Sequence, residues 1–203
     1  MMSTPAAYSR KQPGQRREEI LSAAADIALE AGLERITVRA VAERIGVRPG
    51  LISHYFPVVQ ELVAQAFERA AAGERASILP GGGSPRARVA ALVVFFASEA
   101  SVPLSRLWLN ARHLSRFSPA LAAAVLRQEV ANLQGVTAVV EEGIRRGEFT
   151  APDAAAAAKR ILMAVDATTI SVNDPPSGAH LVDPGFVGDV AAWALGLSDG
   201  SLG

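Results

Sequence analysis

The chain of 203 residues contains no cysteine, so disulfide bonds, thiolate catalysis and cysteine-ligated metals are excluded. Its three histidines, His54, His113 and His180, lie far apart in sequence and lack the i,i+4 spacing of a helical metal site. No nucleophile–base pair, carboxylate pair or phosphate-binding loop is evident. The glycine-rich segment PGGGSP at 80–85 lacks the lysine of a P-loop. We therefore expect neither a metal nor a cofactor, and a protein that is not an enzyme.

The chain also carries no net charge. The 20 basic residues balance the 20 acidic ones, so the charge of the whole chain gives no argument for a nucleic-acid partner. The first 56 residues hold eight basic and six acidic side chains, a net charge of +2. This small asymmetry has the sign that a nucleic-acid contact near the N-terminus would need.

Long apolar runs are absent too. The longest, near Val89–Ser98, has about half of the ~20 residues that cross a bilayer. Residues 1–14 are polar and lack the apolar core of a signal peptide. We therefore expect no membrane contact and a cytoplasmic location. Half of the residues are hydrophobic and a fifth are charged, which is typical of a globular protein.

No segment alternates apolar and polar residues as a half-buried strand does, so the sequence predicts an all-α protein of about nine helices. We expect a disordered basic arm over 1–14 and two domains, over 15–57 and 58–203. The helix at 86–100 is apolar nearly all round and is predicted to be central. The expected helices are 16–31, 37–45, 48–56, 58–78, 86–100, 101–116, 118 to the RRGEF segment, 152–173 and 183–196.

The segment TVRAVAERIGVRPGLISHYF at 37–56 carries the most specific pattern. Two short helices that meet at Gly46 match the helix-turn-helix unit, whose second helix enters the DNA major groove. Ile52 and Phe56 are four residues apart and are expected to face the core. The other residues of this helix are left for the groove and its phosphates: Arg48, Pro49, Gly50, Leu51, Ser53, His54 and Tyr55.

Each of these residue types has a use at a DNA surface. An arginine such as Arg48 can contact a guanine with two hydrogen bonds, worth about 1–3 kcal/mol of discrimination. Gly50 keeps bulk low where the backbone approaches DNA. Ser53, His54 and Tyr55 can donate to phosphates. Structural alternatives stay open: Tyr55 as a half-buried core aromatic, His54 as a solvated side chain, and Pro49 with Gly50 as helix-start chemistry.

The segment ILSAAADIALEAGLERITVRAVAERIGVRPGLISHYFPVVQELVAQAF resembles the DNA-binding domain of the TetR family of transcriptional regulators. The resemblance runs from about Arg16 to Phe67, roughly a quarter of the chain, and its GLISHYF variant is most similar to the BetI-type, choline-responsive branch. It implies a phosphate contact by Thr37, with Arg39 beside the groove. It also implies that Arg48, Pro49 and Leu51 face bases, and that Ser53, His54 and Tyr55 bind backbone or base edges.

Two positions depart from the family pattern. Ser53 stands where most members have tyrosine, and Val59 stands where most have lysine, so phosphate contacts are lost or shifted. We expect the basic residues at the N-terminus to compensate for them: Arg10, Lys11, Arg16 and Arg17.

The rest of the chain resembles the helical regulatory domain of the same family, which implies an effector pocket and a dimer face. The family pattern places a homodimer interface on the last two helices, about 153–173 and 184–197. The last helix carries an apolar row of Phe186, Val190, Trp193 and Leu197. In the alternative, both helices serve only the core of their own monomer.

The pocket candidates are the larger side chains on helices around the domain centre: Leu92, Phe96, Trp108, Asn110, His113, Phe117, Met163 and Asp166. Aromatic faces can bind a cation such as a quaternary amine, although such residues more often form plain core. Asp166 interrupts an apolar helix, so its carboxylate must be paired or hydrogen-bonded. It would cap a neighbouring helix or bind a ligand amine, and the structural role is the commoner of the two.

The leading hypothesis is a ligand-responsive repressor that binds a palindromic, double-stranded DNA operator as a homodimer and is released by an unknown small-molecule effector. Two alternatives remain at this point. One is an enzymatic domain fused to a helix-turn-helix, for which no catalytic pattern is found. The other is a DNA-binding scaffold without an effector, which the absence of a cavity near Trp108 would favour.

Overall fold

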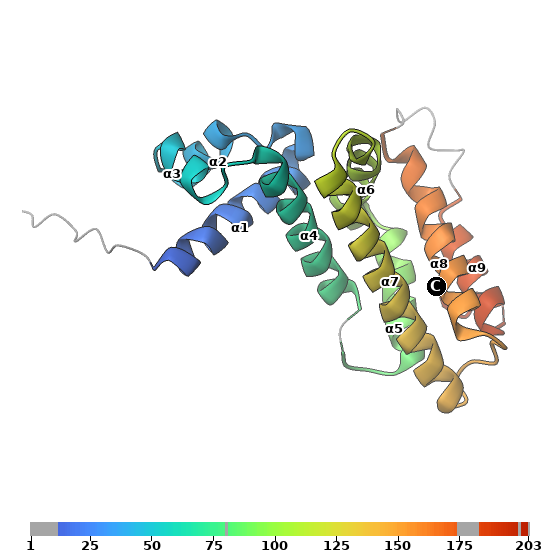
Figure 1. Cartoon of the computed structure of the whole chain (residues 1–203). Coiled ribbons are helices and arrows are strands. Elements are labelled where there is room, and N and C mark those ends of the chain that lie inside the picture. Colours follow the sequence, from blue (N-terminus) through green and yellow to red (C-terminus); the bar gives the residue numbers. More distant parts are fainter. Residues whose placement is uncertain (1–11, 80, 174–182, 199, 203) are drawn as a thin grey trace, which may run out of the picture.

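The computed structural model describes residues 12–79, 81–173, 183–198 and 200–202. Within these residues the chain forms nine α-helices, three short 3-10 turns and no strand, which confirms the all-α prediction. Helices α1 to α3 gather at one end of the molecule and α5 to α9 at the other, with α4 between them (Figure 1). Arg10 and Lys11 of the predicted basic arm, and His180, lie outside the described residues.

The first domain consists of α1 (Pro13–Ala31), a 3-10 turn (Leu33–Arg35), α2 (Val38–Arg44) and α3 (Pro49–Tyr55). Helix α1 begins three residues before the predicted start at Arg16. Pro13 takes a first-turn position that needs no N–H donor, and Gln12 and Gln15 form a reciprocal cap. Helix α2 begins as predicted, because the Thr37 side chain accepts a hydrogen bond from the Ala40 N–H at 3.0 Å.

Gly46 makes the tight turn between α2 and α3. Its φ of +68° lies in the left-handed region, where a side chain would be strained. The turn is closed by the Val47 N–H, which donates to the Ala42 carbonyl at 2.9 Å. The angle between α2 and α3 is therefore set locally, by a glycine where the backbone requires one.

Helix α4 (Val59–Ile78) packs against both halves of the molecule, on α1 at one side and on α7 at the other. Leu62 and Phe67 are fully buried on it. The Phe67 ring meets the ring of Trp108 edge-on, with centroids 5.1 Å apart. The two domains consequently share one continuous hydrophobic core.

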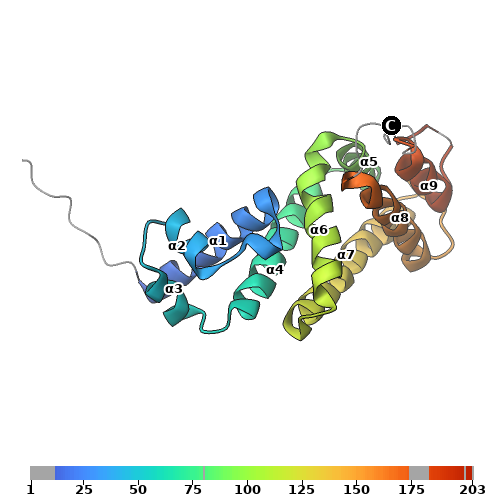
Figure 2. The ribbon, with the colours of Figure 1, turned by 90° about the horizontal axis from the view of Figure 1, so that it is seen from above.

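The second domain consists of α5 (Pro85–Phe96), a 3-10 turn (Glu99–Ser101), α6 (Val102–Ser115), α7 (Pro119–Arg145), α8 (Ala154–Thr169), a 3-10 turn (Ile170–Asn173) and α9 (Phe186–Leu195). Ser84, Ser118 and Asp153 cap α5, α7 and α8, each accepting a hydrogen bond from a backbone N–H three residues on. The helix starts predicted from Ser118-Pro119 and Asp153 are thus confirmed. Seen from above, α6 lies on the side of the bundle that faces the first domain (Figure 2).

The prediction of a central helix at 86–100 is wrong in two respects. Helix α5 ends at Phe96, and a separate 3-10 turn precedes α6. Val94 on α5 is 57% exposed, so the helix lies at the edge of the bundle. The longer α7 takes the central place, in contact with α4, α5, α6 and α8.

In the described part of the chain, no single helix is both long and apolar enough to cross a membrane. One pair of segments, Pro85–Phe96 and Glu99–Ser115, reaches that length and composition together, but the two are bent by 82° at their break.

Candidate DNA-binding surface and effector cavity

Helix α3 divides its side chains between the core and the solvent as the sequence predicts. Ile52 is fully buried and Phe56 is 2% exposed, which confirms the inward face. Leu51 and Tyr55 are half-buried at its border. The outward flank, as we name it from here on, consists of the exposed residues Arg48, Pro49, Gly50, Ser53 and His54.

Arg48 lies at the N-cap of α3, where its carbonyl accepts from the Leu51 N–H at 2.9 Å. Its guanidinium makes no ion pair or hydrogen bond with any described residue. An exposed arginine without a partner keeps all five N–H donors for another molecule.

Gly50 is not required by the fold of this chain. Its φ is not in the left-handed region, and a Cβ added there would meet nothing within 4 Å. Gly143 on α7 is the opposite case, because a Cβ there would come within 2.0 Å of the Phe149 ring. Helix geometry therefore explains Pro49, which occupies the first helical position without an N–H to lose, but it leaves the glycine unexplained.

The aromatic residues at the end of α3 take different environments. The His54 and Tyr55 rings meet edge-on, with centroids 5.4 Å apart. The Tyr55 ring packs against the core, as its structural alternative predicted. His54 is exposed, so its ring is open to solvent and to any partner of α3.

Thr37 and Arg39 lie at the start of α2 and are exposed. Arg39 donates from Nε to Glu43 at 2.7 Å, and this hydrogen bond raises the pKa of Arg39 above its ordinary value. Because both side chains of this pair are largely exposed, the pair contributes little to stability and can open for another anion.

The two described residues expected to compensate for missing phosphate contacts are occupied inside the domain. Arg16 pairs with Glu19 at 2.5 Å. Arg17 donates to Gln65 and lies over the Phe56 ring, 5.0 Å from its centroid. The Arg16 pair therefore lies within α1, and the Arg17 contacts tie α1 to α4 and to Phe56 at the end of α3.

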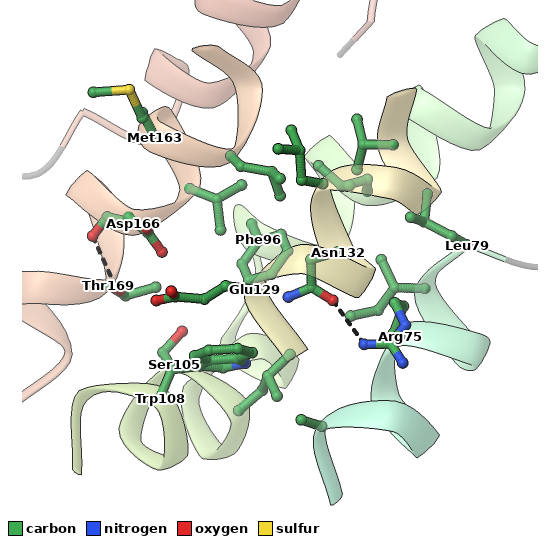
Figure 3. Close-up of a pocket in the computed structure, with 18 of the residues that line it drawn as sticks. Arg75, Leu79, Phe96, Ser105, Trp108, Glu129, Asn132, Met163, Asp166 and Thr169 are labelled. Carbon is green, nitrogen blue, oxygen red and sulfur yellow. Dashed lines mark hydrogen bonds between the residues drawn. The ribbon is translucent and has the colours of Figure 1, made fainter. Parts of the chain in front are cut away.

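A cavity of about 370 Å³ lies in the second domain, between α4, α5, α6, α7 and α8 (Figure 3). Its size is that of a small-molecule site, and its lining is mostly apolar with a few charged groups. Five of the eight pocket candidates line it: Leu92, Phe96, Trp108, Met163 and Asp166. Met163 is 64% exposed and points away from the centre of the close-up.

The other three pocket candidates lie elsewhere. The Asn110 side chain accepts a hydrogen bond from the Leu33 N–H at 2.8 Å and joins α6 to the first domain. His113 is exposed, and its ring meets that of Phe117, which is 72% exposed. Neither ring lines the cavity.

Asp166 has the partner that its position requires. Arg112 donates to both of its carboxylate oxygens, at 3.0 and 2.9 Å, and from Nε to Glu129 at 3.3 Å. The Arg112 guanidinium also lies over the Trp108 ring, 5.3 Å from its centroid. Asp166 is therefore paired within the chain, as a structural role requires, although its side chain is about half exposed.

Arg75 and Arg112 are cavity residues that sequence reasoning missed. A signal for Arg112 existed, since Asp166 needed a partner and Arg112 stands one helical turn after Trp108. No comparable signal marks Arg75, which lies near the end of the alanine-rich α4.

In the described residues no group of three or more histidine, aspartate or glutamate side chains is placed to hold a metal ion. The arrangement that remains is a helix-turn-helix with a free polar flank, attached to a helical bundle that holds a cavity. This defines the class of structure: a helix-turn-helix domain joined to a second, helical domain.

Comparison with known proteins finds a family that is similar to part of the chain. Residues 20–66 match the family model described as bacterial regulatory proteins, tetR family. The chain is 31% identical over 121 residues to the HTH-type transcriptional regulator BetI of Burkholderia thailandensis, an alignment that covers 52% of this chain. It spans about half (57%) of the length of that relative. Residues 20–66 are therefore similar to the DNA-binding domain of TetR-family regulators.

Solved structures share the whole fold. A TetR-family regulator structure from Rhodococcus sp. superposes with a TM-score of 0.68 at 22% identity, covering 90% of this chain and 96% of that one. A transcriptional regulator from Saccharomonospora viridis, solved in complex with choline, gives a TM-score of 0.66 at 18% identity, covering 89% of this chain and 94% of that one. Both proteins are named as transcriptional regulators. At such identities the likeness shows the fold alone.

Proposed function

We propose that this protein is a ligand-responsive transcriptional repressor that binds a palindromic operator as a homodimer and is released by a small-molecule effector. The observation that carries the proposal is the outward flank of α3, where the exposed Arg48 has no side-chain partner among the residues that the structure describes. Helix-turn-helix proteins place this part of the second helix against base edges in the major groove.

The homodimer is supported by apolar surface on the last two helices. Trp193 on α9 is 67% exposed, Met163 on α8 is 64% exposed and Ile170 just after α8 is 69% exposed. The guanidinium of Arg160 lies over the Trp193 ring at 5.1 Å. Several large apolar side chains exposed on adjacent helices are typical of an interaction surface. A twofold interface there would present two α3 helices to one duplex, with half-sites about one helical turn apart.

Effector binding is supported by the cavity. The scaffold alternative would have been favoured by the absence of a cavity near Trp108, and Trp108 lines one of about 370 Å³. An effector releases DNA only if it binds the two conformational states of the protein with different affinity.

The test begins with selection of binding sequences from a pool of random duplexes. The proposal predicts that the enriched sequences are inverted repeats. Arg48→Ala should then weaken binding to the selected duplex by about tenfold or more, and should relax preference at one base pair of each half-site.

Arg145→Ala is the matched control, because Arg145 is an exposed arginine of the second domain, at the end of α7. Both variants remove one positive charge. Equal loss of affinity in the two variants, or no loss in Arg48→Ala, would contradict the proposed contact.

A further inference from the structure

The formal charges of the side chains that line the cavity do not sum to zero. Its lining includes three basic side chains, Arg75, Arg112 and Lys159, and two acidic ones, Glu129 and Asp166. The formal charge of the lining is therefore +1. A site lined mostly by apolar groups with one uncompensated positive charge favours a ligand with one negative charge.

Arg112 is not the uncompensated group. It donates to Asp166 through both terminal nitrogens and to Glu129 through Nε, so all three guanidinium nitrogens are bound to carboxylates. It also covers the Trp108 ring, which is the aromatic face that a quaternary amine would need. The two carboxylates and the indole that could have held a cationic ligand are thus already held by Arg112.

Two basic residues of the lining, Lys159 and Arg75, are paired with no carboxylate among the described residues; Lys159 is exposed, whereas Arg75 is half-buried. The Nη1 of Arg75 donates to the amide oxygens of Gln128 at 2.8 Å and Asn132 at 3.0 Å. The close-up shows the guanidinium beside the Asn132 amide at one wall of the cavity (Figure 3). Its Nε and Nη2 donate to no described atom. These two nitrogens form one edge of the planar fork, which matches the two oxygens of a carboxylate.

We propose that the cavity binds an apolar molecule with a single carboxylate, held by the Nε and Nη2 edge of Arg75. The apolar part lies among Leu92, Phe96, Leu104, Leu133 and Leu162, which line the same cavity. The inference rests on the proposed function, since it names the chemical class of the effector. It differs from the quaternary amine that the sequence pattern indicated.

The position of Arg75 connects this site to the DNA-binding domain. Arg75 lies near the end of α4, the helix that packs against α1. Its bonds to Gln128 and Asn132 tie α4 to α7. A carboxylate bound to the same guanidinium draws it toward the cavity and alters that tie, so the ligand acts on the helix that both domains share.

The experiment measures binding calorimetrically with three probes that share one chain and differ in the head group: octanoate, octanol and octyltrimethylammonium. The protein without DNA is used, so the result does not depend on the operator. The proposal predicts that octanoate binds most tightly. Arg75→Gln should weaken octanoate binding by about tenfold to a hundredfold and leave octanol binding unchanged, and Arg75→Lys should lie between.

Arg127→Gln is the matched control. Arg127 also joins α4 and α7, through Glu68 at 2.6 Å, but it does not line the cavity. It should bind octanoate as the unmodified protein does. Thermal unfolding followed by circular dichroism confirms that each variant is folded.

Preference for octyltrimethylammonium, equal binding of octanol, or no binding of any probe would overturn the carboxylate proposal while leaving DNA binding intact. If octanoate binds through Arg75 but does not release a selected duplex, the site stands and the effector-controlled part of the proposed function fails.

Discussion

The outward flank of α3 takes its groups from one short run, 48–54, whereas the cavity collects its five charged side chains from α4, α6, α7 and α8. The first site is made by local geometry: one turn, one cap and one helical face. The second exists only after five helices have packed. A surface site of the first kind can be located by counting residues, and an interior site of the second kind requires the packed structure.

The largest expected effect concerns the proposed dimer, which would present two α3 helices to one DNA duplex. Trp193→Glu places a charge on the exposed apolar surface of α8 and α9 and should dissociate the proposed dimer. Because two linked half-sites bind far more tightly than one, operator affinity should fall by about a hundredfold or more. Sedimentation equilibrium and gel-shift titration measure the two effects.

Leu126→Glu controls for the added charge, since Leu126 is 61% exposed on α7 rather than on α8 or α9. A Trp193→Glu protein that still sediments as a dimer would remove this surface from the interface.

A second prediction compares two glycines, one in each region. Gly143→Ala should destabilise the fold by about 1–3 kcal/mol, because the new Cβ would overlap the Phe149 ring. Gly50→Ala meets no atom of the chain and should leave stability equal or up to about 1 kcal/mol higher. Urea denaturation gives both values.

The two variants should rank in the opposite order when their affinity for the operator is measured. Gly50→Ala is expected to weaken it, since the added methyl group lies where the backbone of α3 approaches DNA. A folded Gly143→Ala protein, measured at a temperature where it is native, should bind normally. If Gly50→Ala binds DNA as tightly as the unmodified protein, α3 does not approach the duplex at that point.

The smallest expected effect concerns the hydrogen bond between the Leu33 N–H and the Asn110 side chain, which joins the first domain to α6. Asn110→Ala removes the acceptor for the Leu33 N–H and should cost about 1 kcal/mol of stability. Asn110→Asp retains an acceptor oxygen and serves as the control. The free energy of unfolding of Asn110→Ala should fall below that of Asn110→Asp, and an equal value in the two variants would show that the bond contributes nothing.

The helices of the first domain could be predicted from the sequence because their determinants are adjacent in the chain. Thr37, Gly46 and Pro49 mark the helix ends, and the spacing of Ile52 and Phe56 marks the buried face of α3. The DNA contacts themselves remain predictions.

The cavity was predicted in part, and the misses have a geometric cause. An α-helix turns by about 100° per residue, so Asn110 is about 200° round α6 from Trp108 and faces the other domain. Arg112, four residues after Trp108, returns to the same face and lines the cavity. Trp108, Asn110 and His113 are thus close in sequence but lie on different faces of α6.

The even apolar pattern of residues 86–100 misled for a different reason. A helix without a polar face gives no direction to its burial, and its neighbours decide where it lies. The longer α7 occupies the middle of the bundle, which leaves α5 at the edge with Val94 exposed.

Sharing of α4 between the two halves also limits where the chain can be cut or recombined. A fragment that stops before Val59 would lose Leu62 and Phe67 from beneath α1, and one that keeps α4 would leave Phe67 without the indole of Trp108. A chimaera that joins the first domain and α4 of this chain to the second domain of a relative would therefore need an aromatic residue on α6 at the position of Trp108.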